Sequence, residues 1–160
     1  MDFVTLLKRD HEKFLSIFHQ TQRGFDQPDT PDRHQLFRQL KSELELHAAV
    51  EGLHVYRVFQ QSEFTHDDAH EAQEAHAKIK TILEQLETAQ VYDHNWVSEF
   101  HELQKLVETH VAAEENEMFR KSEEFMTPQE AEELGIAITS AKQAISRNAP
   151  TTEGGTPERT

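Results

Sequence analysis

The fold is decided by residues 47–57, which read HAAVEGLHVYR. Residues 110–120 read HVAAEENEMFR and repeat His, Ala, Glu and Arg at matching places, with Phe119 where the first stretch has Tyr56. In both stretches a histidine precedes a glutamate by four residues, which puts the two side chains on one face of a helix. The repetition predicts two equivalent helices that contribute equivalent groups to one site. The alternative is a coincidence between two helices rich in Ala and Glu.

Apolar residues recur at helical spacing along most of the chain, without the sustained alternation of a strand. The pattern predicts an all-α, up-down-up-down four-helix bundle in residues 1–147, with a short extra C-terminal helix against its outside or end. Residues 148–160 have lost the apolar stripe and are predicted to form a disordered tail. The five stripes are Phe3, Leu7, Phe14, Phe18 and Phe25; Leu36, Leu40, Leu44, Val55 and Val58; Ala72, Ile79, Leu83 and Leu86; Trp96, Phe100, Leu103, Val107 and Met118; and Leu134, Ile138, Ala141 and Ile145.

The breaks between the stripes carry the signals of helix starts. Residues 28–31, PDTP, offer Thr30 as an N-cap with proline at the first helical position. Thr65 and Asp93 are predicted to cap the next two helices. Residues 127–130 are typical of a capping box with a proline inside it.

Composition excludes several classes of function. The formal net charge is −14, from 16 Lys and Arg against 30 Asp and Glu, which argues against binding to nucleic acid or to an anionic membrane. The absence of cysteine excludes disulfides, thiolate catalysis and iron–sulfur clusters. No apolar run approaches the ~20 residues of a membrane span, and charges interrupt the N-terminal MDFVTLLKRDH too early for a signal peptide. We therefore expect a cytoplasmic protein.

Each of the four long stripes is interrupted by polar residues on its core face. His11 interrupts the first stripe and His76 the third, while a His-x3-Glu pair interrupts each of the other two, namely His47 with Glu51 and His110 with Glu114. Eleven histidines and 22 glutamates give about 1.5 such pairs by chance, and the chain has three. The His-x3-Glu spacing alone therefore does not identify a metal site. The third pair, His70 with Glu74, lies on a polar stripe and is predicted to face solvent.

The positions of the turns place the four core histidines at one height. Two residues level with each other on adjacent antiparallel helices are equally far from the turn that joins the helices. The midpoint of His11 and His47 is residue 29, that of His47 and His76 lies between residues 61 and 62, and that of His76 and His110 is residue 93. All three midpoints fall on turns that were predicted independently. We therefore expect four imidazoles and both carboxylates to converge, because packed helices are only about 8–10 Å apart.

Four imidazoles and two carboxylates in one layer suit a site for two metal ions, in which carboxylates bridge ions about 3.5–4 Å apart. Imidazole binds iron, copper, zinc and nickel, and the oxygen ligands favour iron or manganese over copper. The alternative is a wet polar layer that only fixes the register of the helices.

These residues resemble the hemerythrin-like HHE cation-binding domain over residues 1 to about 135. The stretches LLKRDHEKF, ELELHAAVE, EAHAKIK and THVAAEENEMF are similar to the four ligand-bearing helices of that family, in order. The resemblance implies a non-haem centre of two iron ions, with other divalent metals as alternatives. It implies dioxygen, peroxide or nitric oxide as the small-molecule partner. The implied ligands are His11, His47, Glu51, His76, His110 and Glu114.

The sequence departs from the oxygen-carrying hemerythrins in two places. The third helix of the carriers has a His-x3-His pair, but the residue four after His76 is Lys80. The last helix of the carriers has an aspartate five residues after its histidine, where this chain has Glu115, one residue after the HHE-type Glu114. The missing histidine leaves a coordination position for a small molecule or another side chain, and argues against reversible oxygen carriage by the familiar mechanism.

Other polar residues are weaker candidates. Glu43 and Glu115 are possible alternate ligands, and His54 is either a hydrogen-bond partner of Glu51 or a histidine at the surface. Three functions follow from the pattern: a protein that binds or senses oxygen species or nitric oxide, a peroxide-consuming or oxidase enzyme, and an iron store or a module with structural metal. The chain contains no catalytic triad, phosphate-binding glycine loop or dinucleotide-binding motif.

Overall fold

The computed structural model describes residues 1–25, 31–89 and 93–148. Within these ranges the chain is helical, with short turns and no strand. The predicted N-cap at Thr30 lies outside the described residues, as do residues 149–160 of the tail predicted for residues 148–160. Asn148, the first residue of that predicted tail, is instead the last residue of a helix. None of the described helices is both long and apolar enough to cross a membrane.

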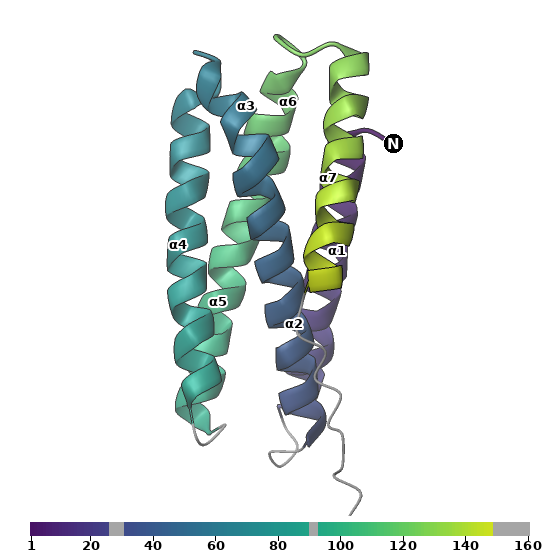
Figure 1. The fold of residues 1–160 in the computed structure, drawn as a ribbon. Coiled ribbons are helices and arrows are strands. Elements are labelled where there is room, and N and C mark those ends of the chain that lie inside the picture. The colour runs from purple at the N-terminus through teal and green to yellow at the C-terminus, as the bar shows by residue number, and fades with distance from the viewer. Residues whose placement is uncertain (26–30, 90–92, 149–160) are drawn as a thin grey trace, which may run out of the picture.

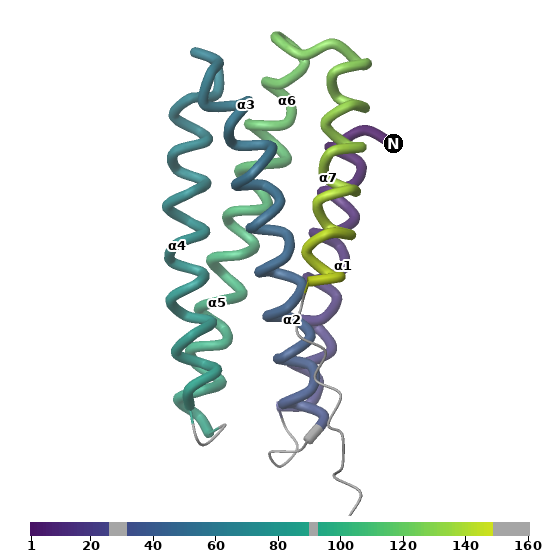
Figure 2. Tube along the Cα trace, viewed as in Figure 1, coloured from purple at the N-terminus to yellow at the C-terminus, as the bar shows by residue number. Residues whose placement is uncertain are grey.

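The first four long helical segments form the predicted up-down-up-down bundle (Figures 1 and 2). The first is α1 (Phe3–Arg23) and the third is α4 (His66–Thr88). The second and fourth are compound. In the second, α2 (Pro31–Val50) continues through the π-helical turn η1 (Glu51–Val55) into α3 (Tyr56–Gln61). In the fourth, α5 (His94–Ala113) continues through η2 (Glu114–Met118) into α6 (Phe119–Ser122).

Two of the predicted helix starts are confirmed by hydrogen bonds. The Asp93 carboxylate accepts hydrogen bonds from the backbone N–H groups of Asn95 and Trp96, so it is the N-cap of α5. Thr127 and Glu130 form the reciprocal pair of a capping box, with donor–acceptor distances of 2.8 and 3.2 Å. Thr65 immediately precedes α4 but does not cap it, because its hydroxyl donates instead to the backbone carbonyl of Phe59 at 2.7 Å. Thr65 thus stands at the predicted N-cap position, but the predicted capping by its side chain was wrong.

The core consists of two apolar clusters stacked along the bundle. One cluster includes Phe14, Phe37 and Trp96 and lies in the half of the bundle that contains the start of α5. The other surrounds Phe3, Tyr56 and Phe59 at the opposite end. The polar residues of the predicted layer lie between these clusters in every long helix, so apolar packing closes the layer off from both ends of the bundle. Leu36 and Val58 are only half-buried, and their neighbours Phe37 and Phe59 are the buried residues.

A fifth helix, α7 (Pro128–Asn148), runs along the outside of the bundle beside α1 (Figure 1). It has 21 residues, as many as α1, so it is not the short helix that the sequence predicted. Ile138 is fully buried against the bundle. Gly135 lies so close to the N-terminus of α1 that a Cβ atom there would collide with the carbonyl oxygen of Met1. This close approach fixes α7 on α1.

Candidate metal centre

The structure brings together all six residues of the predicted site. They form two groups of four potential ligands, and within each group one atom from every residue lies within 4.8 Å of the others. The two groups share Glu51 and Glu114. One group adds His11 and His47, and the other adds His76 and His110. Each long helical segment contributes one histidine, as the predicted turns required.

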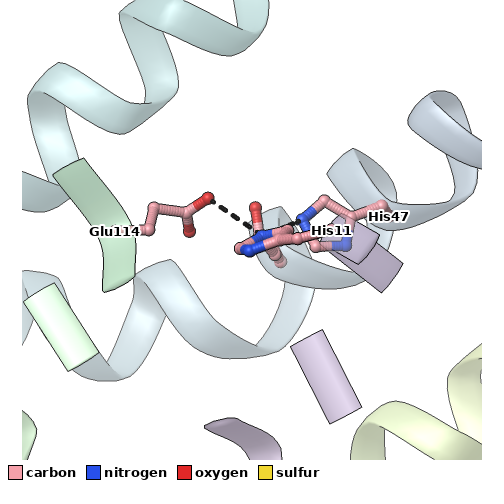
Figure 3. Close-up of side chains that lie close together, drawn as sticks. His11, His47 and Glu114 are labelled. Carbon is pink, nitrogen blue, oxygen red and sulfur yellow. Dashed lines mark hydrogen bonds and ion pairs between the residues drawn. The ribbon is translucent and has the colours of Figure 1, made fainter. Parts of the chain in front are cut away.

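The first group lies between α1, α2 and the two π-helical turns. Nε2 of His11 lies 3.3 Å from Nε2 of His47, and Nε2 of His47 lies 3.0 Å from Oε1 of Glu51. Glu114 approaches His11 from the opposite side, with 3.7 Å between its Oε1 and Nε2 of the ring (Figure 3). The inward atoms of both rings are therefore the Nε2 nitrogens.

The second group repeats this arrangement between α4 and α5. Nε2 of His76 lies 2.9 Å from Nε2 of His110 and 3.0 Å from Oε2 of Glu51. Nε2 of His110 lies 2.6 Å from Oε1 of Glu114. Glu51 thus directs one carboxylate oxygen to a histidine of each group.

Hydrogen bonds outside the layer orient the first pair of rings. Nδ1 of His11 donates to Glu115 at 2.9 Å, and Nδ1 of His47 donates to Asp10 at 3.0 Å. A neutral imidazole that donates from Nδ1 keeps a lone pair on Nε2. When both rings are neutral, their Nε2 lone pairs point into the layer, as they do in histidines that bind metal ions through Nε2.

The two carboxylates are deeply buried and incompletely satisfied. Glu51 is 0% and Glu114 1% exposed, and Oε1 of each receives no hydrogen bond of normal geometry from the described part of the chain. Each Oε1 has only ion-pair contacts there, the closest to Nε2 of His47 or of His110, and a buried carboxylate whose charge is not balanced costs several kcal/mol. Inward lone pairs around two such carboxylates form a donor set that fits two cations.

The pKa values of the metal-free layer reflect this need for positive charge. Burial lowers the pKa of His47 and His110, but the charge of Glu51 beside His47 and of Glu114 beside His110 outweighs it, raising these values to about 10 and about 9. Burial and repulsion from His47 lower the pKa of His11 to about 4. Burial and the charge of Glu51 raise the pKa of Glu114 to about 7. Two protonated rings therefore supply the positive charge when no metal is bound.

Both glutamates stand at the first residue of a π-helical turn, which sequence reasoning missed. The backbone N–H of Tyr56 donates to the carbonyl of Glu51, and that of Phe119 donates to the carbonyl of Glu114, five residues back in each case. Such turns are rare and are frequent at functional sites. The repeat of residues 47–57 in residues 110–120 extends to the backbone, which supports a duplicated site over a coincidence of composition.

Tyr56 is a second feature that sequence reasoning missed. Its hydroxyl donates to Oε2 of Glu51 at 2.7 Å and lies 2.9 Å from Nε2 of His76. Burial and the charge of Glu51 raise the pKa of the phenol well above its usual value, so the side chain is neutral and holds its proton. The corresponding Phe119 stacks on His11 instead, with 6.1 Å between ring centroids. The only sequence signal was a tyrosine in one repeat where the other has phenylalanine.

The weaker candidates lie outside the layer. Glu43 pairs with Lys13 at 2.6 Å on the bundle surface, and Glu115 contacts only the outer nitrogen of His11, so neither belongs to the two ligand groups. His54 is half-buried in η1, and among the described residues it makes no hydrogen bond to Glu51. His70 and Glu74 are exposed, as expected.

A cavity of about 530 Å³ connects the layer with the surface between α2 and α4. His47, His76 and His110 line it together with apolar side chains such as Leu44 and Leu83. Lys80 also lines the cavity, at the position where the oxygen carriers have their additional histidine. The cavity therefore borders histidines of both groups.

Comparison with known proteins agrees with this geometry. The model of the hemerythrin HHE cation-binding domain matches residues 2–122 and ends before α7, short of residue 135 where we expected the resemblance to end. The fold is similar to the crystal structure of a hemerythrin HHE cation-binding domain-containing protein, the Rv2633c homolog from Mycobacterium kansasii. The TM-score is 0.76 at 18% identity, covering 95% of this chain and 94% of that one. No curated protein matches the chain. The chain therefore belongs to the hemerythrin HHE cation-binding domain family.

Proposed function

We propose that this chain holds two metal ions in its polar layer and uses them to bind or respond to dioxygen, peroxide or nitric oxide. His11 and His47 bind one ion, and His76 and His110 bind the other. Glu51 and Glu114 lie between the two ions. The observation that carries the proposal is the pair of buried Oε1 atoms of Glu51 and Glu114, which lack normal hydrogen bonds among four inward Nε2 nitrogens.

Iron is the metal that this donor set favours. Two imidazoles and shared carboxylates for each ion suit iron better than copper, while zinc and manganese remain chemically compatible. The neighbouring carboxylates outweigh burial and raise the pKa of His47 to about 10 and that of His110 to about 9, so we expect metal uptake to displace a proton from each ring. Binding therefore releases protons.

The two metal positions differ in their access to small molecules. His76 is the most accessible of the six residues, with 15% of its side chain exposed, and it lines the cavity beside Lys80. No histidine occupies position 80, so the ion at His76 and His110 has fewer imidazole ligands than in the oxygen carriers. When bound, the metal pair supplies electrons to the small molecule. The apolar walls of the cavity favour small uncharged molecules over hydrated ions.

Tyr56 favours a second candidate function, a peroxide-consuming enzyme. Its neutral hydroxyl lies 2.9 Å from Nε2 of His76 and therefore holds a proton next to the accessible position. Cleavage of a peroxide needs a proton for the oxygen that leaves, and a positioned tyrosine can donate it. Dismutation of hydrogen peroxide into water and dioxygen requires no other reductant.

Anaerobic loading with ferrous iron and mixing with each small molecule tests the proposal. We expect dioxygen, hydrogen peroxide or nitric oxide to change the visible spectrum of the loaded protein. Steady consumption of peroxide, with dioxygen release, would assign the enzyme. A single stoichiometric change would assign the binding or sensing protein. If the loaded protein responds to none of the three molecules, the proposed oxygen chemistry is wrong.

A further inference from the structure

The C-terminal helix α7 reaches the metal centre although it lies outside residues 2–122, which the family model matches. Lys142 of α7 forms an ion pair with Oδ2 of Asp10. The same oxygen accepts the hydrogen bond from Nδ1 of His47. A chain of three side chains therefore connects α7 with the ring whose Nε2 faces the layer.

The ammonium group of Lys142 is held in place by the docking of its helix. Ile138, one helical turn earlier on the same face, is fully buried, and Gly135 fixes α7 against the start of α1. Asp10 and Lys142 are themselves partly shielded, with 16% and 24% of their side chains exposed. An ion pair in such a place is more restrained than one between freely moving surface side chains.

The two histidine groups differ in the hydrogen bonds that their Nδ1 atoms make outside the layer. In the first group, Nδ1 of His47 donates to Asp10 and Nδ1 of His11 donates to Glu115. For His76 and His110, the described ranges of the chain place no hydrogen-bond partner on Nδ1. Outer partners of this kind fix the ring, raise its basicity and strengthen metal binding.

We propose that α7 contributes to the metal centre through Lys142, which is a positioning residue. Lys142 holds Asp10 against His47, and the fixed His47 ring helps to retain the metal ion bound by His11 and His47. Without Lys142, the partly exposed Asp10 carboxylate is free to turn towards water, and His47 loses its fixed partner. The ion at His11 and His47 should therefore leave more slowly than the ion at His76 and His110. This inference rests on the two-metal site proposed above.

Release of iron to an excess of a coloured ferrous chelator tests the inference. Wild-type protein, loaded anaerobically with Fe²⁺, should release its iron in a fast and a slow phase. Asp10→Ala should accelerate the slow phase about 10- to 100-fold, the range for loss of an outer partner of a metal ligand. Lys142→Met should accelerate it measurably but by no more than about tenfold, because it acts through Asp10. Lys142→Arg, which keeps the charge, should restore slow release.

The double variant and a matched control separate this role from simple packing. Lys142→Met should have no further effect in the Asp10→Ala background. Lys121→Met removes a similar interhelical pair, from Lys121 to Asp68 at 2.8 Å, which contacts none of the six site residues, and should leave both phases unchanged. Thermal unfolding of the metal-free variants should verify that each one is folded.

Two results would overturn the inference while leaving the metal site intact. One is wild-type release kinetics in Lys142→Met. The other is an equal acceleration by Lys142→Met with and without Asp10. If wild-type protein instead takes up no iron, the proposed two-metal function fails at the loading step, before release is measured.

Discussion

The hydroxyl of Tyr56 donates a 2.7 Å hydrogen bond to Oε2 of Glu51, the carboxylate that faces both histidine groups. The two residues are five positions apart, and a regular α-helix turns about 100° per residue, so it would separate them by about 140° around the axis. The π-helical turn that begins at Glu51 rotates the chain less per residue and so reduces this offset. The unusual backbone therefore places a phenol in the polar layer.

Tyr56→Phe tests whether this phenol supplies a proton. We expect the variant to bind as much iron as wild type, because all six proposed ligands remain. Its ferrous form should react with hydrogen peroxide about 10²-fold more slowly or worse, the usual loss when a positioned proton donor is removed. Stopped-flow spectra with parallel iron analysis measure both quantities. A peroxide rate equal to that of wild type would exclude proton donation by Tyr56.

The position of the layer could be predicted from the sequence, whereas the contacts around it could not. His11, His47, His76 and His110 were placed at one height because helix length and turn position follow from apolar periodicity and from capping residues such as Asp93. These signals concern one helix at a time.

The missed features depend on backbone irregularity or on contacts between helices. The approach of Tyr56 to Glu51 requires a π-helical turn, which a regular helical spacing does not reveal. Asp10 is the neighbour of His11 in sequence but binds His47 on another helix, and Lys142 joins it from a third. Thr65 has a typical capping residue type, yet its hydroxyl turns back to Phe59.

The response to pH should differ between metal-free and loaded protein. In the metal-free protein the folded-state pKa values of His47 and His110, about 10 and about 9, lie above the unfolded value of about 6.5. Their contribution to stability is therefore fully present below about pH 6.5 and is lost as the pH rises through the folded values. Metal binding needs the deprotonated rings, so metal affinity should rise over the same range.

The measurement is the melting temperature of both forms at a series of pH values. The difference between loaded and metal-free protein should widen as the pH rises from about 6.5 through the folded values of about 9 and about 10. Acidification through roughly pH 6 to 4 should release the metal. A difference that stays constant across this range, or melting temperatures that coincide at pH 7, would contradict metal binding by these histidines.

Lys80→His tests the accessible coordination position. The substitution gives the third long helix the His-x3-His pair of the oxygen carriers, and so adds an imidazole to the ion at His76 and His110. We expect dioxygen to oxidise the ferrous variant more slowly than wild type, or to form an adduct with a persistent visible spectrum. The time course of absorbance after mixing with dioxygen shows either result. Lys78→His, on an adjacent exposed position, is the control and should oxidise like wild type.

Ala48→Phe tests the cavity as the route of entry. Ala48 is half-buried in α2 and lines the cavity, so a phenyl ring there fills part of the path to His76. The second-order rate of nitric oxide binding to the ferrous protein should fall by about tenfold or more, which corresponds to about 1.4 kcal/mol in the barrier. Iron content should not change. An unaltered rate would show that small molecules enter by another path.

Counting bound iron in the glutamate variants tests the central claim most directly. The account predicts about two equivalents of iron per chain in wild type, and one or none in Glu51→Ala and Glu114→Ala, because each carboxylate serves both ions. His70→Ala removes a histidine with the same His-x3-Glu spacing on the exposed face and should keep about two equivalents. Wild-type protein that binds no metal under any reconstitution condition, or glutamate variants that still bind about two equivalents, would contradict the two-metal site.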